Sequence, residues 1–298
     1  MNPFGQILIA LRDQSLHQGG LWEFPGGKVE ASESKEQALV RELKEELDIN
    51  VRDASPLITI NYQYPDLSVQ LYVYRVDSFE GVAKSCVGHP IRWVEPEHLP
   101  DFAFPAANQP IITAAQLPSC YAILDDAQPD YLLLNLRKLL QNGIKLIQAR
   151  LKRLTLAELQ QFFKIAYPLC KQYKALLLLN SAVQCAEQFA VDGLHLTSAD
   201  LRARQARPDK LRWLAASCHD LAELQHAQQI GVDFVVLAPV LPTPTHPDAK
   251  ILGWQQFTEL VSQINLPVYA LGGMTNGDLI MAQRSGGQGI AAVRAFLG

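Results

Sequence analysis

The sequence predicts two domains of different fold class, an α+β domain over residues 1–117 and an α/β domain over residues 118–298. Three observations support this prediction. The chain has 298 residues, which is more than one domain usually holds. The first part arranges strands around one acidic helix, whereas the part after Pro118-Ser119 alternates short apolar runs with amphipathic stretches. Such alternation indicates parallel strands joined by crossover helices.

In the first domain, the apolar run at residues 6–11 has the length of a strand. Residues 57–64 and 68–76 are apolar and aromatic and are separated by a Pro-Asp turn, which predicts a hairpin. Residues 91–94 predict a further strand, and residues 105–117 predict a closing helix.

The second domain contains a series of short apolar runs, which we interpret as strands. They lie at residues 121–124, 144–148, 175–179, 193–196, 211–217, 233–237, 267–271 and 289–293. Amphipathic stretches such as residues 154–171 and 220–230 lie between them. This many units predicts a closed (β/α)8 barrel, although at about 180 residues it is smaller than the usual ~250.

A cluster of glutamates marks the acidic helix of the first domain. Glu42, Glu45 and Glu46 are spaced i, i+3 and i+4, which places them on one helix face, where like charges repel. A hard divalent cation such as Mg²⁺ relieves this repulsion and contacts substrate phosphates at the same time. The alternative is an acidic face that is simply solvated.

The turn before this helix suits the metal interpretation. Pro25-Gly26-Gly27 is a tight bend without large side chains, so backbone carbonyls can approach an ion or a phosphate. Ser34 and Gln37 have the spacing of a capping box at the start of the helix.

Together these residues form a spaced pattern. Gly27 is followed by Glu33, and then by the run from Arg41 to Ile49, RELKEELDI. The pattern resembles the Nudix box, except that Asp48 stands where that family usually has Gly; a short polar residue tolerates the left-handed conformation at a helix end.

The resemblance implies an α/β/α sandwich of the Nudix type and a role for each matched residue. It implies Mg²⁺, or Mn²⁺ in its place, bound by Glu42, Glu45, Glu46 and the Gly26 carbonyl. It also implies that Arg41 orients the carboxylates and that Glu33 supports the loop.

Further segments narrow the resemblance to the MutT type, which hydrolyses oxidised purine triphosphates. These segments are WEFPGGKVE, YQYPDLSVQLYVY, GHPIRWV and FPAANQPII. By this resemblance Asn108 reads the purine edge. Trp22 or Phe24 is a candidate for stacking on the base, unless these aromatic side chains belong to the core, and Arg12 is a candidate phosphate contact.

Two departures from that subgroup stand out. Val87 occupies a position where the subgroup often has a glutamate that acts as metal ligand or base, so Glu45 or Glu46 must serve as base here. The family also has a strand ahead of residues 6–11. We therefore expect either that Met1 is an internal start or that the sheet has an open edge, with Ile7 and Ile9 exposed.

The predicted strand ends of the second domain carry polar and glycine residues, and barrels of this kind keep their chemistry there. In order, these motifs resemble thiamine phosphate synthase and its relative TenI, which implies a small TIM barrel of that family. The residues concerned are Gln148, Arg150, Lys152, Asn180, His195, Asp200, Ser217, Thr243, Thr245, Gly272 and Gly273.

We expect Arg150 and Lys152 to meet a pyrophosphate, Thr243 and Thr245 to bind its oxygens, and Gly272-Gly273 to offer backbone N–H groups. Each residue could instead be structural, with Asn180 in a turn and His195 as a satisfied barrel histidine.

Two positions of the barrel differ from the synthases. Ser181 stands where they have a Mg²⁺-binding Asp, and His246 stands where they have a phosphate-binding Lys, while the other ligand, Asp200, is kept. Losing one of two carboxylates should weaken a magnesium site severely, so we do not expect full synthase activity.

Composition excludes several classes of protein. The chain is 48% hydrophobic and 19% charged with net charge −4, and it has no apolar run of membrane-span length and no signal sequence, so a cytoplasmic location follows. Neither half is basic enough for a nucleic-acid polymer. The cysteines are odd in number and form no CxxC pair, so we expect them to be reduced packing residues. They are Cys86, Cys120, Cys170, Cys185 and Cys218.

Three functions remain to be separated. The leading hypothesis is a Mg²⁺-dependent Nudix pyrophosphohydrolase of nucleoside triphosphates that converts 8-oxo-dGTP to 8-oxo-dGMP and pyrophosphate. The second is a thiamine phosphate synthase that joins a pyrimidine pyrophosphate to a thiazole phosphate, with the Nudix half clearing damaged thiamine precursors. The third is a catalytically silent barrel that binds thiazole phosphate or stabilises the Nudix domain.

Overall fold

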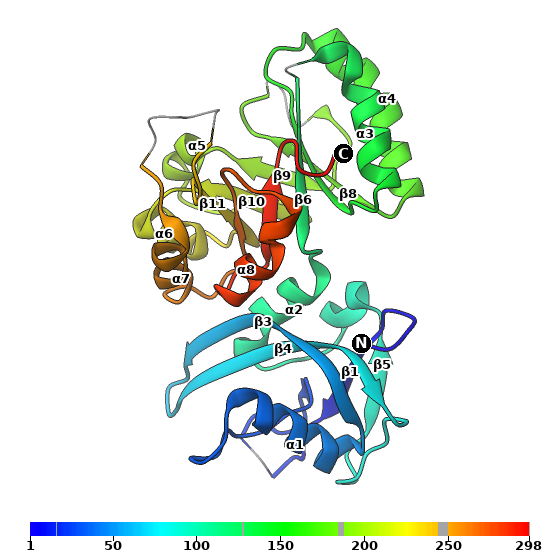
Figure 1. Ribbon diagram of the computed structural model, residues 1–298, viewed down its shortest axis with the longest axis vertical. Helices are drawn as coiled ribbons and strands as arrows, with labels where there is room; N and C mark the ends of the chain where they lie inside the picture. Colours follow the sequence, from blue (N-terminus) through cyan, green and yellow to red (C-terminus); the bar gives the residue numbers. More distant parts are fainter. Residues whose placement is uncertain (16, 127, 184–187, 244–249, 298) are drawn as a thin grey trace. The chain divides into compact units, whose positions relative to one another are not determined.

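The structure, a computed structural model, describes residues 1–15, 17–126, 128–183, 188–243 and 250–297. The chain divides into two compact units, Met1–Gln116 and Leu117–Gly298 (Figure 1).

The first unit contains a three-stranded and a two-stranded antiparallel sheet. In the first sheet, β1 lies between β2 and β5, and in the second, β3 pairs with β4. The bounds are β1 Ile7–Leu11, β2 Trp22–Glu23, β3 Asn50–Gln63, β4 Ser68–Glu80 and β5 Ile91–Val94. The helices are α1 Lys35–Leu47, η1 Pro96–Asp101, η2 Ala106–Asn108 and α2 Gln109–Gln116. The hairpin is longer than expected because its ladder continues through several register shifts.

Helices cover both faces of the β1 sheet, which makes the unit an α/β/α sandwich. Leu43 and Leu47 of α1 pack with Leu8 of β1 on one face. Ile9 packs with Ile112 of α2 on the other face. Burying side chains of this size contributes about 1.5–3 kcal/mol each.

The expectation of an exposed β1 is wrong for its central residue. Strand β1 is paired on both sides, and Ile9 is 0% exposed because Leu99 of η1 and Ile112 of α2 cover it. Ile7 is half-buried against the same cluster.

In the second unit, the described residues contain eight strands that pair in parallel and close into a barrel. Their bounds are β6 Cys120–Asp125, β7 Leu146–Arg150, β8 Leu176–Asn180, β9 Gly193–Leu196, β10 Trp213–Cys218, β11 Phe234–Leu237, β12 Val268–Ala270 and β13 Gly289–Ala292. The helices are α3 Leu132–Gln141, α4 Leu156–Gln172, α5 Ser198–Ala203, α6 Leu221–Gln229, α7 Gly253–Val261 and α8 Leu279–Arg284, with short 3-10 turns η3 Pro129–Tyr131 and η5 Asn276–Asp278. The predicted barrel is confirmed.

Side chains alternate between two cores along the barrel strands. Tyr121, Phe234 and Tyr269 point into the barrel with ring centroids 5.5 to 5.6 Å apart, and Phe234 packs edge to face against both tyrosines. The outer core lies between the strands and the surrounding helices, among them α3 and α4, which run side by side in Figure 1.

No helix in the described part of the chain is both long and apolar enough to cross a membrane. Four described cysteines are free thiols: Cys86, Cys120, Cys170 and Cys218. Cys170 and Cys218 are buried packing residues, but Cys86 is exposed, so the expectation that it packs in a core is wrong. Cys185 lies outside the described residues.

Candidate functional site

The acidic helix face of the first unit is organised by Arg41. Its Nη1 donates to Glu42 Oε1 at 2.9 Å and to Glu45 Oε2 at 3.3 Å. Its Nε and Nη2 donate to the two carboxylate oxygens of Glu33 at 3.1 and 2.6 Å, and Nη2 also reaches the Lys28 carbonyl at 3.0 Å. One guanidinium therefore ties the loop to two of the three glutamates that are predicted to bind metal.

The local structure that presents this face follows from the sequence. Ser34 and Gln37 form the predicted capping box at the start of α1, and Asp48 takes the left-handed conformation at its end, with φ 53°. The hydrogen bonds from Arg41 also lower the pKa of Glu33, so that this carboxyl stays ionised.

Glu46 occupies a different environment from the other glutamates. Its Oε2 accepts a hydrogen bond from the Gly26 backbone N–H at 3.2 Å, which joins α1 to the glycine turn. Burial raises the pKa of Glu46, and the charges of Glu42 and Glu23 raise it further. A carboxylate with raised proton affinity suits a general base better than an ordinary one does.

The glycine turn is shaped around a carboxylate. A Cβ built on Gly27 would lie 2.2 Å from the Oε1 of Glu42, so only glycine leaves this space. Gly26 has φ 145°, which favours glycine on conformational grounds. As they stand, no three His, Cys, Asp or Glu side chains of the described residues are grouped as a metal cage, because Arg41 and the Gly26 N–H hold the glutamates. The oxygen donors and the glycine cradle fit Mg²⁺.

The residues predicted to contact the nucleotide lie in two different environments, an ion pair for Arg12 and aromatic packing for Phe24 and Trp22. Arg12 forms an ion pair with Glu23, and both side chains are largely buried, so Arg12 must leave this partner to contact a phosphate. Phe24 stacks on Phe104 with centroids 5.2 Å apart and belongs to the core. Trp22 meets Phe102 edge to face at 5.4 Å.

Asn108 ends η2, immediately before α2. The Asn108 side chain makes no hydrogen bond with other described residues. This amide is therefore available to a ligand.

Val87 is 50% exposed and has no group that could bind a metal.

Sequence reasoning missed two residues beside the acidic face. Glu23 lies opposite Ala10 of β1, on the face that α1 covers, and its charge acts on Glu46. The charge of His89 acts on both Glu23 and Glu46. The WEFPGG segment contained Glu23, but only the sheet register shows where it points.

In the second unit, the predicted residues meet at the carboxyl ends of the barrel strands. Arg150 ends β7, Asn180 ends β8 and Ser217 lies near the end of β10. The Arg150 guanidinium lies 3.6 Å from Asp125 Oδ2, whereas Lys152 is exposed. Thr243 is described and has interactions of its own, while Thr245 and His246 lie outside the described residues.

Gly272 and Gly273 form a bend that other residues would not fit. Both have positive φ, 102° and 66°. Added Cβ atoms would lie 2.8 Å from Pro239 Cβ and 2.4 Å from the Pro242 carbonyl oxygen. The backbone can therefore approach a phosphate closely here.

A buried chain of hydrogen bonds crosses the barrel interior. Tyr121 Oη lies 2.9 Å from His195 Nδ1, and His195 Nε2 lies 2.9 Å from Ser217 Oγ. Gln148 Nε2 donates to Tyr121 Oη at 3.2 Å, and Asn180 donates to Gln148 at 3.4 Å. Burial lowers the pKa of His195 to about 3, so the imidazole is neutral. Tyr121 was missed because its apolar neighbours in the sequence place it in the core.

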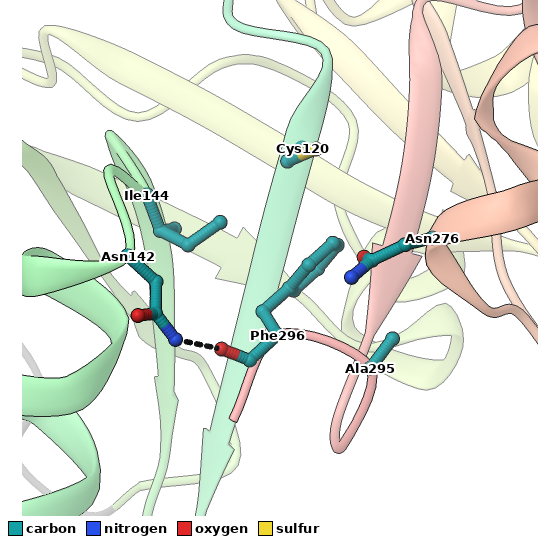
Figure 2. Close-up of a pocket in the computed structure, with 6 residues that line it drawn as sticks. All are labelled: Cys120, Asn142, Ile144, Asn276, Ala295 and Phe296. Carbon is teal, nitrogen blue, oxygen red and sulfur yellow. Dashed lines mark hydrogen bonds between the residues drawn. The ribbon is translucent and has the colours of Figure 1, made fainter. Parts of the chain in front are cut away.

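A pocket of about 410 Å³ lies on the outer wall of the barrel and not at the strand ends. It is lined by Cys120, Asn142, Ile144, Asn276, Ala295 and Phe296. Figure 2 shows the Phe296 side chain directed toward Cys120 and Asn276, and Asn142 donates to the Phe296 carbonyl at 3.0 Å. None of the predicted barrel residues lines this pocket.

Comparisons with known proteins agree with both halves. The family described as thiamine monophosphate synthase matches residues 120–296, and the NUDIX domain matches residues 1–114. A putative thiamine-phosphate synthase 2 of Aquifex aeolicus is 34% identical over 186 residues, which cover 61% of this chain and 99% of that protein.

Two solved structures are also similar. The thiamine phosphate pyrophosphorylase of Pyrococcus furiosus, at 24% identity and TM-score 0.52, covers 60% of this chain and 88% of its own, and supports the barrel fold. A MutT structure from work on Aliivibrio salmonicida and Vibrio cholerae is 39% identical over 37% of this chain and 85% of its own, with TM-score 0.33. The chain belongs to the thiamine monophosphate synthase family, and its barrel is fused to an N-terminal segment that matches the NUDIX domain.

Proposed function

We propose that the first unit is a metal-dependent pyrophosphohydrolase that acts on nucleoside triphosphates, and in particular on oxidised purines such as 8-oxo-dGTP. The observation that carries this proposal is the acidic face beside the Gly26-Gly27 turn, where Arg41 binds Glu42 and Glu45 and the Gly26 N–H binds Glu46. The products would be the nucleoside monophosphate and pyrophosphate.

Glu42, Glu45, Glu46 and the Gly26 carbonyl would hold Mg²⁺ or Mn²⁺. When bound, the ion supplies charge neutralisation on the phosphates and lowers the pKa of a bound water. Glu42 and Glu45 would have to leave Arg41 to hold the ion, whereas the two bonds from Arg41 to Glu33 would still hold the loop in place. Glu46 or Glu45 would accept the proton of the attacking water, because Val87 has no basic group to offer.

The nucleotide would be recognised by groups near the start of α2. The Asn108 amide can both donate and accept, so it can match a purine edge with two hydrogen bonds. Arg12 would transfer from Glu23 to a phosphate, and the partly buried Phe24 would support the base pocket from the core.

A substrate screen with the purified chain in Mg²⁺ tests this function. The panel contains 8-oxo-dGTP, dGTP, ATP and thiamine diphosphate, and pyrophosphate release is measured. We expect 8-oxo-dGTP to have the highest kcat/KM. Fastest hydrolysis of thiamine diphosphate would favour instead the clearing of damaged thiamine precursors.

The site assignment has its own test. Glu45→Gln and Glu46→Gln each remove one charge from the metal site, and we expect at least a ~100-fold loss of kcat with an unchanged circular dichroism spectrum. Electron paramagnetic resonance should also show weaker Mn²⁺ binding. Glu36→Gln is the matched control, because Glu36 is on the same helix but accepts from Tyr74. Comparable turnover in either variant at saturating Mg²⁺ contradicts the assignment.

A further inference from the structure

The carboxylate expected to hold magnesium in the barrel, Asp200, is already engaged. Its Oδ2 accepts hydrogen bonds from Ser181 Oγ and from Thr197 Oγ1, the latter at 2.7 Å. The Ser181 hydroxyl in turn accepts from the Thr197 backbone N–H at 2.9 Å. The Asp200 backbone N–H donates to Thr197 Oγ1 at 3.1 Å. These bonds form a closed network that joins the end of β8 to the start of α5.

This network does not fit a divalent cation. Ser181 offers a neutral hydroxyl where the resemblance to the synthases implies a carboxylate, and that hydroxyl already both donates and accepts. Mg²⁺ prefers carboxylates in near-ideal octahedral geometry and is reluctant to lose its waters. The two hydroxyl groups bind Asp200 Oδ2, which leaves only Oδ1 of this carboxylate for an ion, and one carboxylate oxygen offers Mg²⁺ little.

Neighbouring acidic groups do not replace the missing ligand. Asp125 faces Arg150 at 3.6 Å, and Asp126 is 6% exposed and accepts from the Arg153 backbone N–H. Within the described parts of the barrel, no three His, Cys, Asp or Glu side chains are grouped for metal binding.

Without a metal ion, the described groups at the strand ends suit a phosphate monoester better than a diphosphate. Arg150 and Lys152 bring two positive charges, and Asp125 and Asp200 bring two negative ones. Gly272 and Gly273 add no charge, but without side chains they let the backbone come close to a phosphate. A phosphate monoester carries about −1.5 to −2 and can be held by hydrogen bonds. The two positive and two negative charges of these described residues cancel, so a phosphate is held here by directed hydrogen bonds, and a diphosphate would bring the larger uncompensated charge.

We infer that the barrel binds a phosphate monoester without any divalent cation, and that Ser181 is the residue that removes the metal site. Asp200 then fixes the loop after β8 to α5 instead of holding an ion. This inference concerns the second unit and does not depend on the function proposed for the first.

The test uses the full chain with Glu45→Gln and Glu46→Gln, so that Nudix metal binding does not interfere. Inorganic phosphate and inorganic pyrophosphate are titrated by calorimetry in EDTA and in excess Mg²⁺. We expect the phosphate Kd to change by less than about twofold between the two conditions. We also expect Arg150→Ala to weaken phosphate binding at least ~10-fold, whereas Arg137→Ala, an exposed change on α3, has no effect.

Three outcomes overturn the inference. The first is that Mg²⁺ tightens phosphate binding about tenfold or more and that Asp200→Asn abolishes this effect of Mg²⁺. The others are undetectable phosphate binding, and phosphate binding that Arg150→Ala leaves unchanged.

The role of Ser181 is tested by gain of metal dependence. In the same background, Ser181→Asp restores the second carboxylate, and we expect pyrophosphate binding to become dependent on Mg²⁺. Ser181→Asn, which has similar volume but no charge, should not show this. If Ser181→Asp stays independent of Mg²⁺ while its circular dichroism spectrum is unchanged, residue 181 is not the cause and the inference fails.

Discussion

Single residues determine the geometry of the proposed hydrolase site. Arg41 contacts Glu33, Glu42 and Glu45 at once, so one side chain couples the loop to the helix. A lysine could not do this, because its single ammonium lacks the planar fork of donors. The space for the Glu42 carboxylate depends equally on the missing side chain of Gly27.

Gly27→Ala should separate folding from metal binding. The added Cβ meets only the end of the Glu42 side chain, which can rotate away, so we expect a melting temperature close to wild type. The displaced carboxylate should weaken Mn²⁺ binding at least ~10-fold by electron paramagnetic resonance. Gly5→Ala is the control, since its Cβ meets no atom within 4 Å and any effect there comes from its positive φ. Unchanged Mn²⁺ affinity in Gly27→Ala would remove Glu42 from the metal site.

Asn108→Ala should change selectivity more than rate. Because the amide has no hydrogen-bond partner among the described side chains, its loss costs the fold little. We expect KM for 8-oxo-dGTP to rise ~10-fold or more, and much more than KM for dGTP, since each good base-edge pair is worth about 1–3 kcal/mol. Gln109→Ala, at the next position, is the control. Equal loss for both nucleotides would mean that Asn108 does not read the base.

At the scale of elements, α1 is defined by its two ends. The capping box of Ser34 and Gln37 satisfies backbone N–H groups at the start, and Asp48 ends the helix in the left-handed region. Ion pairs with Lys44 and Lys84 lower the pKa of Asp48 to about 2. The ends thus place the glutamates between the glycine turn and strand β3.

Ser34→Ala should destabilise the first unit alone. Losing an N-cap costs about 1 kcal/mol, which corresponds to a fall of roughly 4 °C in the melting of a domain this size. Thr155→Ala is the matched variant in the barrel, because Thr155 and Glu158 form the same capping box on α4. Calorimetry should show each variant lowering a different transition. If both lower the same transition, the units do not unfold separately.

At the scale of the whole molecule, the barrel unit carries its own pH dependence. His195 is 1% exposed and neutral, and its pKa of about 3 lies below the ordinary value of 6.5 because burial disfavours the charged form. The unfolded chain therefore binds more protons than the folded chain between these values. The stability that this depressed pKa contributes is present above pH ~6.5 and is lost as pH falls toward about 3.

We expect the transition lowered by Thr155→Ala to melt at progressively lower temperature as pH falls from about 7.5 to 5. His195→Gln should flatten this slope, even though it also lowers the melting temperature by breaking bonds to Tyr121 and Ser217. His219→Gln is the control, because that side chain is exposed. An unchanged slope in His195→Gln would show that another group sets the pH dependence.

The sequence by itself determined the order of the two folds, the ends of α1 and the composition of the acidic face. Local signals carried this information: the period of apolar residues, the capping pair Ser34 and Gln37, and the fixed spacing around Glu42, Glu45 and Glu46. Such signals depend on neighbours within a few residues, so they can be read without knowing the fold.

Only the tertiary structure decided which partners those residues take. Sheet pairing and helix cover bury Ile9, the register of β1 places Glu23 beside the acidic face, and barrel closure brings Tyr121 to His195, 74 positions away. The same closure joins Asp200 to Ser181, which changes a predicted metal ligand into part of a hydrogen-bond network. Contacts between distant segments follow from strand register and packing, and no local pattern specifies these.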